Sequence, residues 1–289
     1  MDALILNPFF SIDHQSHTLP SAKKPVLQKI TDLTKSIFKE LLWLMKMCYR
    51  KTFSKPRSEF VECSKPIDWK VNSQGLYVLV HGLRGHPAHW IEQLKILEKE
   101  QTSFDVIAPF VPKQGDCTLE DAAQPILEKI CEYTKNNPTK PVSLIGVSNG
   151  GRIVTWLESE LREKAPNTPV KVSAVAGVHF GSRLVTKARH WPIAKQIVGS
   201  KAIQEELAYG SPKAFELAER LKNGTRFHND ARSFDFYATA EDLCVDVDSA
   251  LPSVANAQHY LVHGAGHNTI VEAVASHQIQ SCQAWMSKF

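Results

Sequence analysis

The residues best suited to chemistry surround Ser148, which stands between two glycines in Gly146-Val147-Ser148-Asn149-Gly150. An apolar run precedes this serine and a helical pattern follows it, so residues 142–164 predict a strand, a sharp turn and a helix with Ser148 at the apex. Such a turn strains the serine backbone, and only small residues two positions before and after it avoid a clash. The hydroxyl then lies beside a helix N-terminus, where an oxyanion is stabilised. The pattern predicts a nucleophilic serine; an ordinary glycine-rich turn is the alternative.

A serine hydroxyl needs a base within hydrogen-bond reach, and His267 is the candidate. It follows an apolar strand expected near 258–263, in a loop that contains Gly264 and Gly266. From such a loop a histidine can turn toward a serine at the end of a neighbouring strand. His263 is the alternative, but it belongs to the strand end, where we expect it to pack. Read as a metal pair, the two histidines would have to lie on a helix, and the glycines argue against one.

The base in turn needs an acid that orients it, and the acid is expected just past a strand end. Residues 234–240 have the pattern of that strand, and three acids follow: Glu241, Asp242 and Asp246. We favour Asp242, with the other two as alternatives, because a turn can present any of the three. The resulting order of serine, acid and histidine along the chain is the one found in α/β-hydrolases.

An oxyanion is stabilised by two backbone N–H groups that converge on it. One is expected from Asn149, directly after the candidate nucleophile. The other should come from a loop after an early strand, and the apolar run at 76–80 is followed by a loop containing Gly82 and Gly85. These glycines allow the loop to pass close to the serine, which makes the Leu83 N–H the predicted second donor.

We expect no metal and no cofactor. His81, His86 and His89 lie close together in the sequence, but no cysteine or carboxylate stands at a ligand spacing from them. We interpret His81 as a structural residue that supports the loop after the strand.

With these four parts located, the chain resembles the α/β-hydrolase superfamily and, within it, the lipase-like serine esterases. The resemblance covers about residues 70–289. Val147 stands where many lipases have histidine, so the resemblance does not extend to one lipase family. The segments that carry it, in chain order, are 76–90, 144–151, 236–245 and 261–270, with a softer match at 176–182.

The order of the elements predicts an α/β fold with a doubly wound, mostly parallel sheet. Short apolar runs without alternation are typical of strands covered on both faces, and helical patterns separate them. At 289 residues and 43% apolar content, the chain can bury one large core. The expected strands are 76–80, 104–109, 142–147, 171–178, 234–240 and 258–263, and the expected helices are 87–99, 118–135, 150–164 and 269–287.

Two regions lie outside this alternation. Residues 58–289 are expected to form the catalytic domain, and within it about 182–232 exceed what one crossover helix needs. We interpret that excess as a helical cap over the active site, with a peripheral helix pair as the alternative. Residues 1–57 are expected to form an N-terminal arm, and Ser54-Lys-Pro-Arg-Ser58 reads as the linker between the two.

The arm carries the positive charge of the chain. Residues 23–57 contain ten lysines or arginines and only Asp32 and Glu40 as acids, which gives +8 against a total of +4. Apolar residues recur in it at a helical period, which predicts a basic amphipathic helix. It suits a membrane surface in one interpretation. In the other, the helix packs its apolar face on the catalytic domain and exposes its charges. No nucleic-acid-binding module is recognisable, so we expect no nucleic-acid partner.

The cysteines and the termini indicate a location. The six cysteines are dispersed without a CxxC pair, so free thiols in a reducing compartment are expected. Residues 1–8 lack the basic region of a classical signal peptide, and the apolar run of the arm is too charged to span a bilayer. We expect a protein that is cytoplasmic or peripheral to a membrane.

The sequence thus predicts a serine hydrolase that cleaves a lipid or other apolar carboxylic ester. The same three side chains also suit an acyltransferase, a thioesterase or an amidase, because the choice of acyl acceptor depends on the pocket. A binding protein without catalytic activity on the same scaffold is the third alternative.

Overall fold

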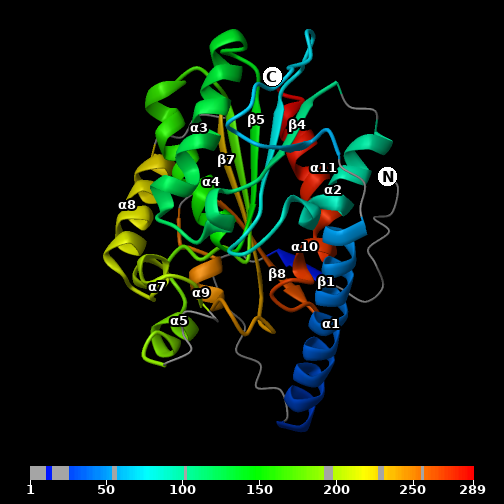
Figure 1. Ribbon diagram of the computed structural model, residues 1–289, viewed down its shortest axis with the longest axis vertical. Helices are drawn as coiled ribbons and strands as arrows, with labels where there is room; N and C mark the ends of the chain where they lie inside the picture. Colours follow the sequence, from blue (N-terminus) through cyan, green and yellow to red (C-terminus); the bar gives the residue numbers. More distant parts are fainter. Residues whose placement is uncertain are drawn as a thin grey trace.

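One mixed sheet runs through the centre of the protein (Figure 1). The computed structural model describes residues 11–14, 26–53, 57–100, 103–191, 198–226, 231–254 and 257–289. Within them, eight strands pair in the order β1-β8-β7-β6-β5-β3-β4-β2. Only β1 is antiparallel to its neighbour. The strands are β1 (Ser11–His14), β2 (Phe60–Val61), β3 (Leu76–Val80), β4 (Asp105–Pro109), β5 (Val142–Val147), β6 (Val170–Val175), β7 (Arg232–Thr239) and β8 (Ala257–His263).

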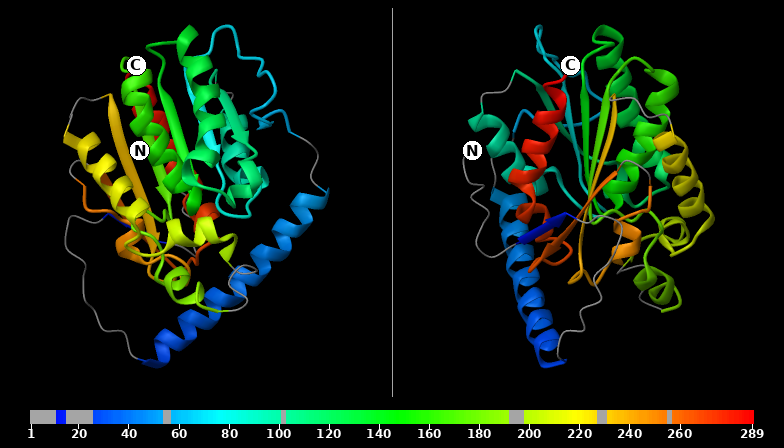
Figure 2. Two further views of the ribbon diagram at one scale, coloured as in Figure 1. Left: turned by 60° about the vertical axis from the view of Figure 1, so that its left-hand side comes forward. Right: turned by 180° about the vertical axis from the view of Figure 1, so that it is seen from behind.

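Helices cover both faces of the sheet, as Figures 1 and 2 show. Successive side chains of β3 point to opposite faces of the sheet. On one face Leu76, Val78 and Val80 pack with α3 and α4. On the other face Tyr77 and Leu79 pack with α2 and α11. The predicted α/β class with a doubly wound, mostly parallel sheet is therefore confirmed. The helices of the two layers are α2 (Ile91–Lys99), α3 (Leu119–Asn136), α4 (Asn149–Lys164), α8 (Pro212–Arg226) and α11 (Ala275–Met286), with the short η1 (Pro87–Trp90), η2 (Pro112–Gly115), α9 (Val247–Ala250) and α10 (Ile270–Ala273) in loops.

Most element boundaries lie within two residues of those expected, and the larger differences have local causes. The strand expected to reach residue 178 ends at Val175, because Ala176 adopts a left-handed φ of 47°. The helix expected over 269–287 is divided into α10 and α11. Neither β1 nor β2 was expected, since four and two residues are too short for a periodic pattern.

The region between β6 and β7 holds α5 (Arg183–Ala188), α7 (Lys201–Leu207) and α8, while residues 192–197 and 227–230 lie outside the described residues. The helix α8 packs on α4 through Leu217 and Leu221, which belong to the core on that face of the sheet. In contrast, α5 and α7 pack on each other at the carboxyl ends of the strands. The role of this insertion as a cap over the active site stays a prediction.

The arm forms the long helix α1 (Val26–Phe53), which lies beside η1 and α10 and extends past the sheet at its N-terminal end (Figures 1 and 2). Residues 1–10, 15–25 and 54–56 lie outside the described residues, including the signal-peptide region and most of the expected linker. Among the helices that the structure describes, none combines the length and apolar character that a bilayer span requires. All six cysteines lie in described segments and are free.

The packing of α1 differs from the alternative in which its apolar face is buried and its charges are exposed. Trp43 and Met47 are buried against Ala88 and Ile91, but the neighbouring charged residues also face the body of the protein. Lys46 and Arg50 both pair with Glu272 of α10, at 2.7 and 2.9 Å. Large apolar side chains are instead exposed on the outer side, namely Ile37, Phe38, Leu41, Leu42, Leu44, Met45 and Tyr49, together with Thr31, Thr34, Lys35, Lys46, Cys48 and Thr52.

Candidate active site

Ser148 occupies the turn between β5 and α4 with φ 56° and ψ −122°, a left-handed conformation that is rare for a residue with a side chain. Close packing on both sides fixes this turn. A Cβ at Gly146 would lie 2.3 Å from the Gly150 carbonyl oxygen, and one at Gly150 would lie 2.2 Å from the Val80 carbonyl oxygen. Only glycine fits at these two positions, and the turn directs the serine hydroxyl past the end of the sheet.

The structure brings Ser148, His267 and Asp242 together in one chain of hydrogen bonds. The Ser148 Oγ lies 3.1 Å from His267 Nε2, and His267 Nδ1 lies 2.7 Å from Asp242 Oδ2. With Nδ1 protonated, the imidazole donates to the carboxylate and accepts from the serine hydroxyl. The order of the three groups is the one that lets an imidazole take a proton from a hydroxyl.

Asp242 is the one of the three candidate acids that reaches His267. Its Oδ1 accepts hydrogen bonds from the backbone N–H groups of Cys244 and Val245, at 2.7 and 2.9 Å, so the carboxylate is fixed from both sides. Glu241 accepts from Thr239 Oγ1 at 2.7 Å, and Asp246 pairs with Arg183 of α5 at 2.9 Å. The alternative histidine, His263, is the last residue of β8 and lies opposite Ser11 of β1.

The imidazole of His267 is mostly buried, with 13% of its side chain exposed. Burial by itself lowers the pKa of His267, but the charges of Asp242 and, to a smaller extent, Glu40 outweigh burial and raise this pKa above its ordinary value. A base whose pKa is raised holds an abstracted proton more firmly, and its conjugate acid forms at a higher pH.

The loop after β3 passes directly against the serine. A Cβ at Gly82 would lie 3.0 Å from Ser148 Cβ, which shows how closely the two backbones approach. His81 holds this loop in place: its Nδ1 is 2.9 Å from the Gly82 carbonyl oxygen, and its Nε2 accepts from the Val111 N–H at 3.2 Å. Leu83 and Ser148 line the same cavity. The role of the Leu83 and Asn149 N–H groups in holding an oxyanion stays a prediction.

Side chains beneath the turn support it in ways that the sequence did not indicate. Arg152 of α4 is fully buried, donates to Asn149 Oδ1 at 3.0 Å and pairs with Glu206 of α7 at 3.1 Å. His179 is also fully buried, against Gly177, and burial together with the nearby charge of Arg152 lowers the pKa of His179 to about 3. The Arg152–Glu206 pair joins two elements more than fifty residues apart, so no spacing rule predicts it.

A cavity of about 230 Å³ opens over the serine, with His267 on one side. Its size and lining suit an apolar group. Most of the wall comes from apolar side chains of the insertion and of the loops beside it, which include Val178, Leu184, Val185, Val198, Leu207 and Val245.

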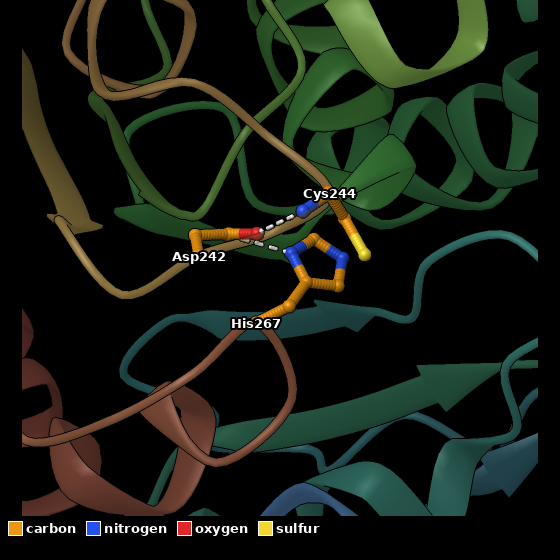
Figure 3. Close-up of side chains that lie close together, drawn as sticks. All are labelled: Asp242, Cys244 and His267. Carbon is orange, nitrogen blue, oxygen red and sulfur yellow. Dashed lines mark hydrogen bonds and ion pairs between the residues drawn. The ribbon is translucent and has the colours of Figure 1, made fainter. Parts of the chain in front are cut away.

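The side chains of Asp242, Cys244 and His267 lie close together (Figure 3). Their possible ligand atoms all lie within 4.8 Å of one another. The donor set does not favour a metal. Asp242 is already engaged by His267 and by two N–H groups, and metals bind cysteine as the thiolate. Burial and the neighbouring carboxylates of Asp242 and Glu40 raise the pKa of the Cys244 thiol to about 12, which keeps it protonated. The geometry fits a hydrogen-bonded acid–base pair better than a metal centre.

Comparison with known proteins places the fold. No family model and no curated protein sequence matches the chain. Among solved structures, the chain is similar to a structure described under LipS and LipT, two metagenome-derived lipolytic enzymes, with a TM-score of 0.54, 13% identity, and coverage of 77% of this chain and 97% of that one. The chain is also similar to the mature lipase BlEst2 of Bacillus licheniformis, with a TM-score of 0.50, 16% identity, and coverage of 76% of this chain and 95% of that one. For Est1E of Butyrivibrio proteoclasticus with ferulic acid bound, the TM-score is 0.51 and the identity 15%, and the match covers 76% of this chain and 94% of that one.

These similarities show that the chain has the α/β-hydrolase fold, as lipases and esterases do. At such low identity the likeness concerns the fold and does not by itself assign an activity.

Proposed function

We propose that this protein is a serine hydrolase that cleaves carboxylic esters with an apolar acyl group. The observation that supports this best is the continuous hydrogen-bonded chain from Ser148 Oγ through the imidazole of His267 to the carboxylate of Asp242, at the mouth of an apolar cavity. The fold that it shares with lipolytic enzymes and esterases supports the same reaction class.

In the proposed mechanism, Ser148 Oγ attacks the ester carbonyl carbon while His267 Nε2 takes the hydroxyl proton. Asp242 orients the imidazole and stabilises the imidazolium that forms. The carbonyl oxygen becomes an oxyanion, which the N–H groups of Leu83 and Asn149 stabilise. The tetrahedral intermediate collapses, His267 returns the proton to the leaving alkoxide, and the alcohol departs. Water then attacks the acyl-enzyme with His267 as base, which releases the acid and restores the serine.

A lipid surface is the proposed source of the substrate. The apolar side chains on the outer side of α1 lead into a second cavity of about 250 Å³, whose lining includes Ile37, Leu41, Leu243 and His267. Leu243 is itself 59% exposed. Apolar surface that continues from a helix to the candidate base suits an amphipathic helix lying in the boundary layer of a membrane.

Covalent labelling tests the mechanism directly. The wild-type protein should react with a fluorophosphonate at Ser148 and hydrolyse p-nitrophenyl esters, and Ser148→Ala should lose both reactions. The matched control is Ser159→Ala, which removes a hydroxyl from the same helix; that hydroxyl donates to the Trp156 carbonyl. Equal labelling of wild type and Ser148→Ala would exclude Ser148 as the nucleophile.

A panel of esters with graded acyl chains then tests the substrate class. We expect kcat/KM to rise from acetyl to medium-chain esters, because each methylene placed in the cavity contributes about 0.8 kcal/mol. Falling values from acetyl upward would contradict an apolar acyl site. Product analysis with added alcohol, thiol or amine distinguishes hydrolysis from acyl transfer.

A further inference from the structure

We infer that Glu40 of α1 is a positioning residue that holds the His267 loop in its reactive geometry. The inference rests on the proposed function, in which His267 is the base, and adds to it that the N-terminal helix completes the active site.

The carboxylate of Glu40 accepts hydrogen bonds from the two residues that follow His267. Glu40 Oε1 accepts from the backbone N–H of Asn268 at 3.0 Å and of Thr269 at 3.1 Å. The side chains of the same two residues also donate to the carboxylate, Asn268 Nδ2 at 2.7 Å and Thr269 Oγ1 at 3.2 Å. One carboxylate therefore collects four donors within two residues of the imidazole, and hydrogen bonds to an ionised group are stronger than neutral ones.

The other side of the loop is fixed as well. Lys39, the neighbour of Glu40 on α1, donates to the Gly264 carbonyl oxygen at 2.6 Å. Thr239 Oγ1 of β7 lies 2.8 Å from the Ala265 carbonyl oxygen and shares its one hydrogen between this oxygen and Glu241. Two adjacent residues of α1 therefore hydrogen-bond to the loop, one of them three residues before His267 and the other directly after it. A loop with two glycines has little stiffness of its own, so its position depends on these contacts.

The helix that carries Glu40 is itself firmly attached. Arg50 is 8% exposed and joins Glu272 of α10 to Glu92 of α2. Trp43 is buried and packs edge-on against His89, with 4.9 Å between ring centroids. These contacts fix the orientation of α1 independently of Glu40. Replacement of Glu40 is therefore expected to release the loop without releasing the helix.

Glu40 also places a second negative charge near the imidazole. The charged and titratable groups that the structure places around His267 are Asp242, Glu241 and Cys244 from the acid turn, Glu40 and Lys39 from α1, and His89 from η1 across the cavity. Both Asp242 and Glu40 raise the pKa of His267. Removal of the Glu40 charge should therefore lower that pKa and move the acidic limb of the pH–rate profile to lower pH, because the neutral base then persists in more acidic solution.

The test measures the rate of fluorophosphonate labelling at Ser148 and the kcat and KM of a short ester across pH, in the full-length protein. We expect Glu40→Ala to lower kcat by about tenfold to a hundredfold with KM changed by less than about threefold. Glu40→Gln keeps an acceptor oxygen at the same reach. It should recover most of kcat while still showing the acidic limb at lower pH.

Lys46→Ala is the matched control, since it removes an ion pair between α1 and α10 but leaves the Glu40 contacts in place. It should change kcat little and leave the acidic limb unmoved. Wild-type kcat and an unmoved limb in Glu40→Ala would overturn the inference. So would a loss of kcat in Lys46→Ala equal to that in Glu40→Ala. Absence of labelling in the wild-type protein would instead refute the proposed function, so the two failures are distinct.

Discussion

The two partners of the proposed proton transfer are held in place by different means. Ser148 stands on a turn whose geometry is imposed by backbone packing, with Gly146 and Gly150 in contact with carbonyl oxygens. His267 stands on a loop that is held by side chains, among them Lys39 and Glu40 from a helix more than two hundred residues earlier. The nucleophile is fixed by close steric contacts of the backbone, whereas the base depends on long-range hydrogen bonds.

This difference separates what is rigid in the site from what can be adjusted. A turn that excludes a single methyl group has no second arrangement of similar energy. A loop held by hydrogen bonds can shift when one donor or acceptor changes. We therefore expect substitutions around Ser148 to act on folding, and substitutions around His267 to act on rate and on pH dependence.

The largest effect is expected from the acid. Asp242→Asn should lower kcat by about 10⁴-fold, because an amide in place of the carboxylate favours the wrong tautomer of His267. The protein should stay folded, which circular dichroism verifies. Asp246→Asn is the control, because Asp246 pairs with Arg183 rather than with His267. A similar loss of kcat in Asp246→Asn, or no loss in Asp242→Asn, would contradict the assignment of Asp242 as the acid that orients His267.

A substitution in the turn should act on stability. In Gly150→Ala the added methyl group would overlap the Val80 carbonyl oxygen, so β3 and α4 must move apart. We expect a loss of about 2–4 kcal/mol in the free energy of unfolding, within the range of severe packing changes. Denaturant unfolding measures this loss. Glu163→Ala, at an exposed site of the same helix, should change the value by less than about 0.5 kcal/mol. Equal stability of the two variants would show that the turn can relax.

Much of the molecule follows from local pattern, and the reason is physical. The central strands are fully buried runs with helices between them, so their periodicity reports their environment, and the fold class could be predicted. The turn at Ser148 was visible because steric exclusion leaves a glycine signature in neighbouring residues. Local pattern does not select Asp242 among the three candidates, since a turn of three acids carries no periodic signal.

The helix α1 shows where this kind of inference ends. Its apolar residues predict a helix, but they do not tell which side faces the body. Its packing side is decided by Trp43, Met47 and a set of ion pairs with partners on α2 and α10. Glu40 has no sequence signal at all, because its partners at 268 and 269 become neighbours only in the folded chain.

The buried histidine His179 should make the stability of the folded protein depend on pH. The folded protein keeps His179 neutral down to a pKa of about 3, whereas the unfolded chain takes up that proton below about pH 6.5. Stability should therefore fall as pH is lowered, by about 2 kcal/mol between pH 7 and pH 5 from this residue alone. Denaturant unfolding of His179→Leu and His179→Gln should lack that part of the slope. The exposed His190 serves as the control, and His190→Leu should keep it.

The smallest expected effect concerns the outer side of α1. Phe38 is 61% exposed there, and Phe215 of α8 is 62% exposed on a helix that packs on the other face of the sheet. If α1 lies on lipid, Phe38→Ser should weaken sedimentation with phosphatidylcholine–phosphatidylserine vesicles about tenfold, the effect of losing one apolar side chain from the interface. The matched Phe215→Ser should not.

Salt dependence sharpens this last test. Lys39, Lys46 and Arg50 are engaged by protein groups, so fewer cations face the lipid than the +8 charge of residues 23–57 suggests. Binding should therefore depend more on apolar contact than on anionic lipid, and should weaken only modestly between low and physiological salt. Equal binding by the two phenylalanine variants would show that the apolar side of α1 does not face lipid. Binding that disappears at physiological salt would show that cations, rather than this apolar surface, bring the protein to the membrane.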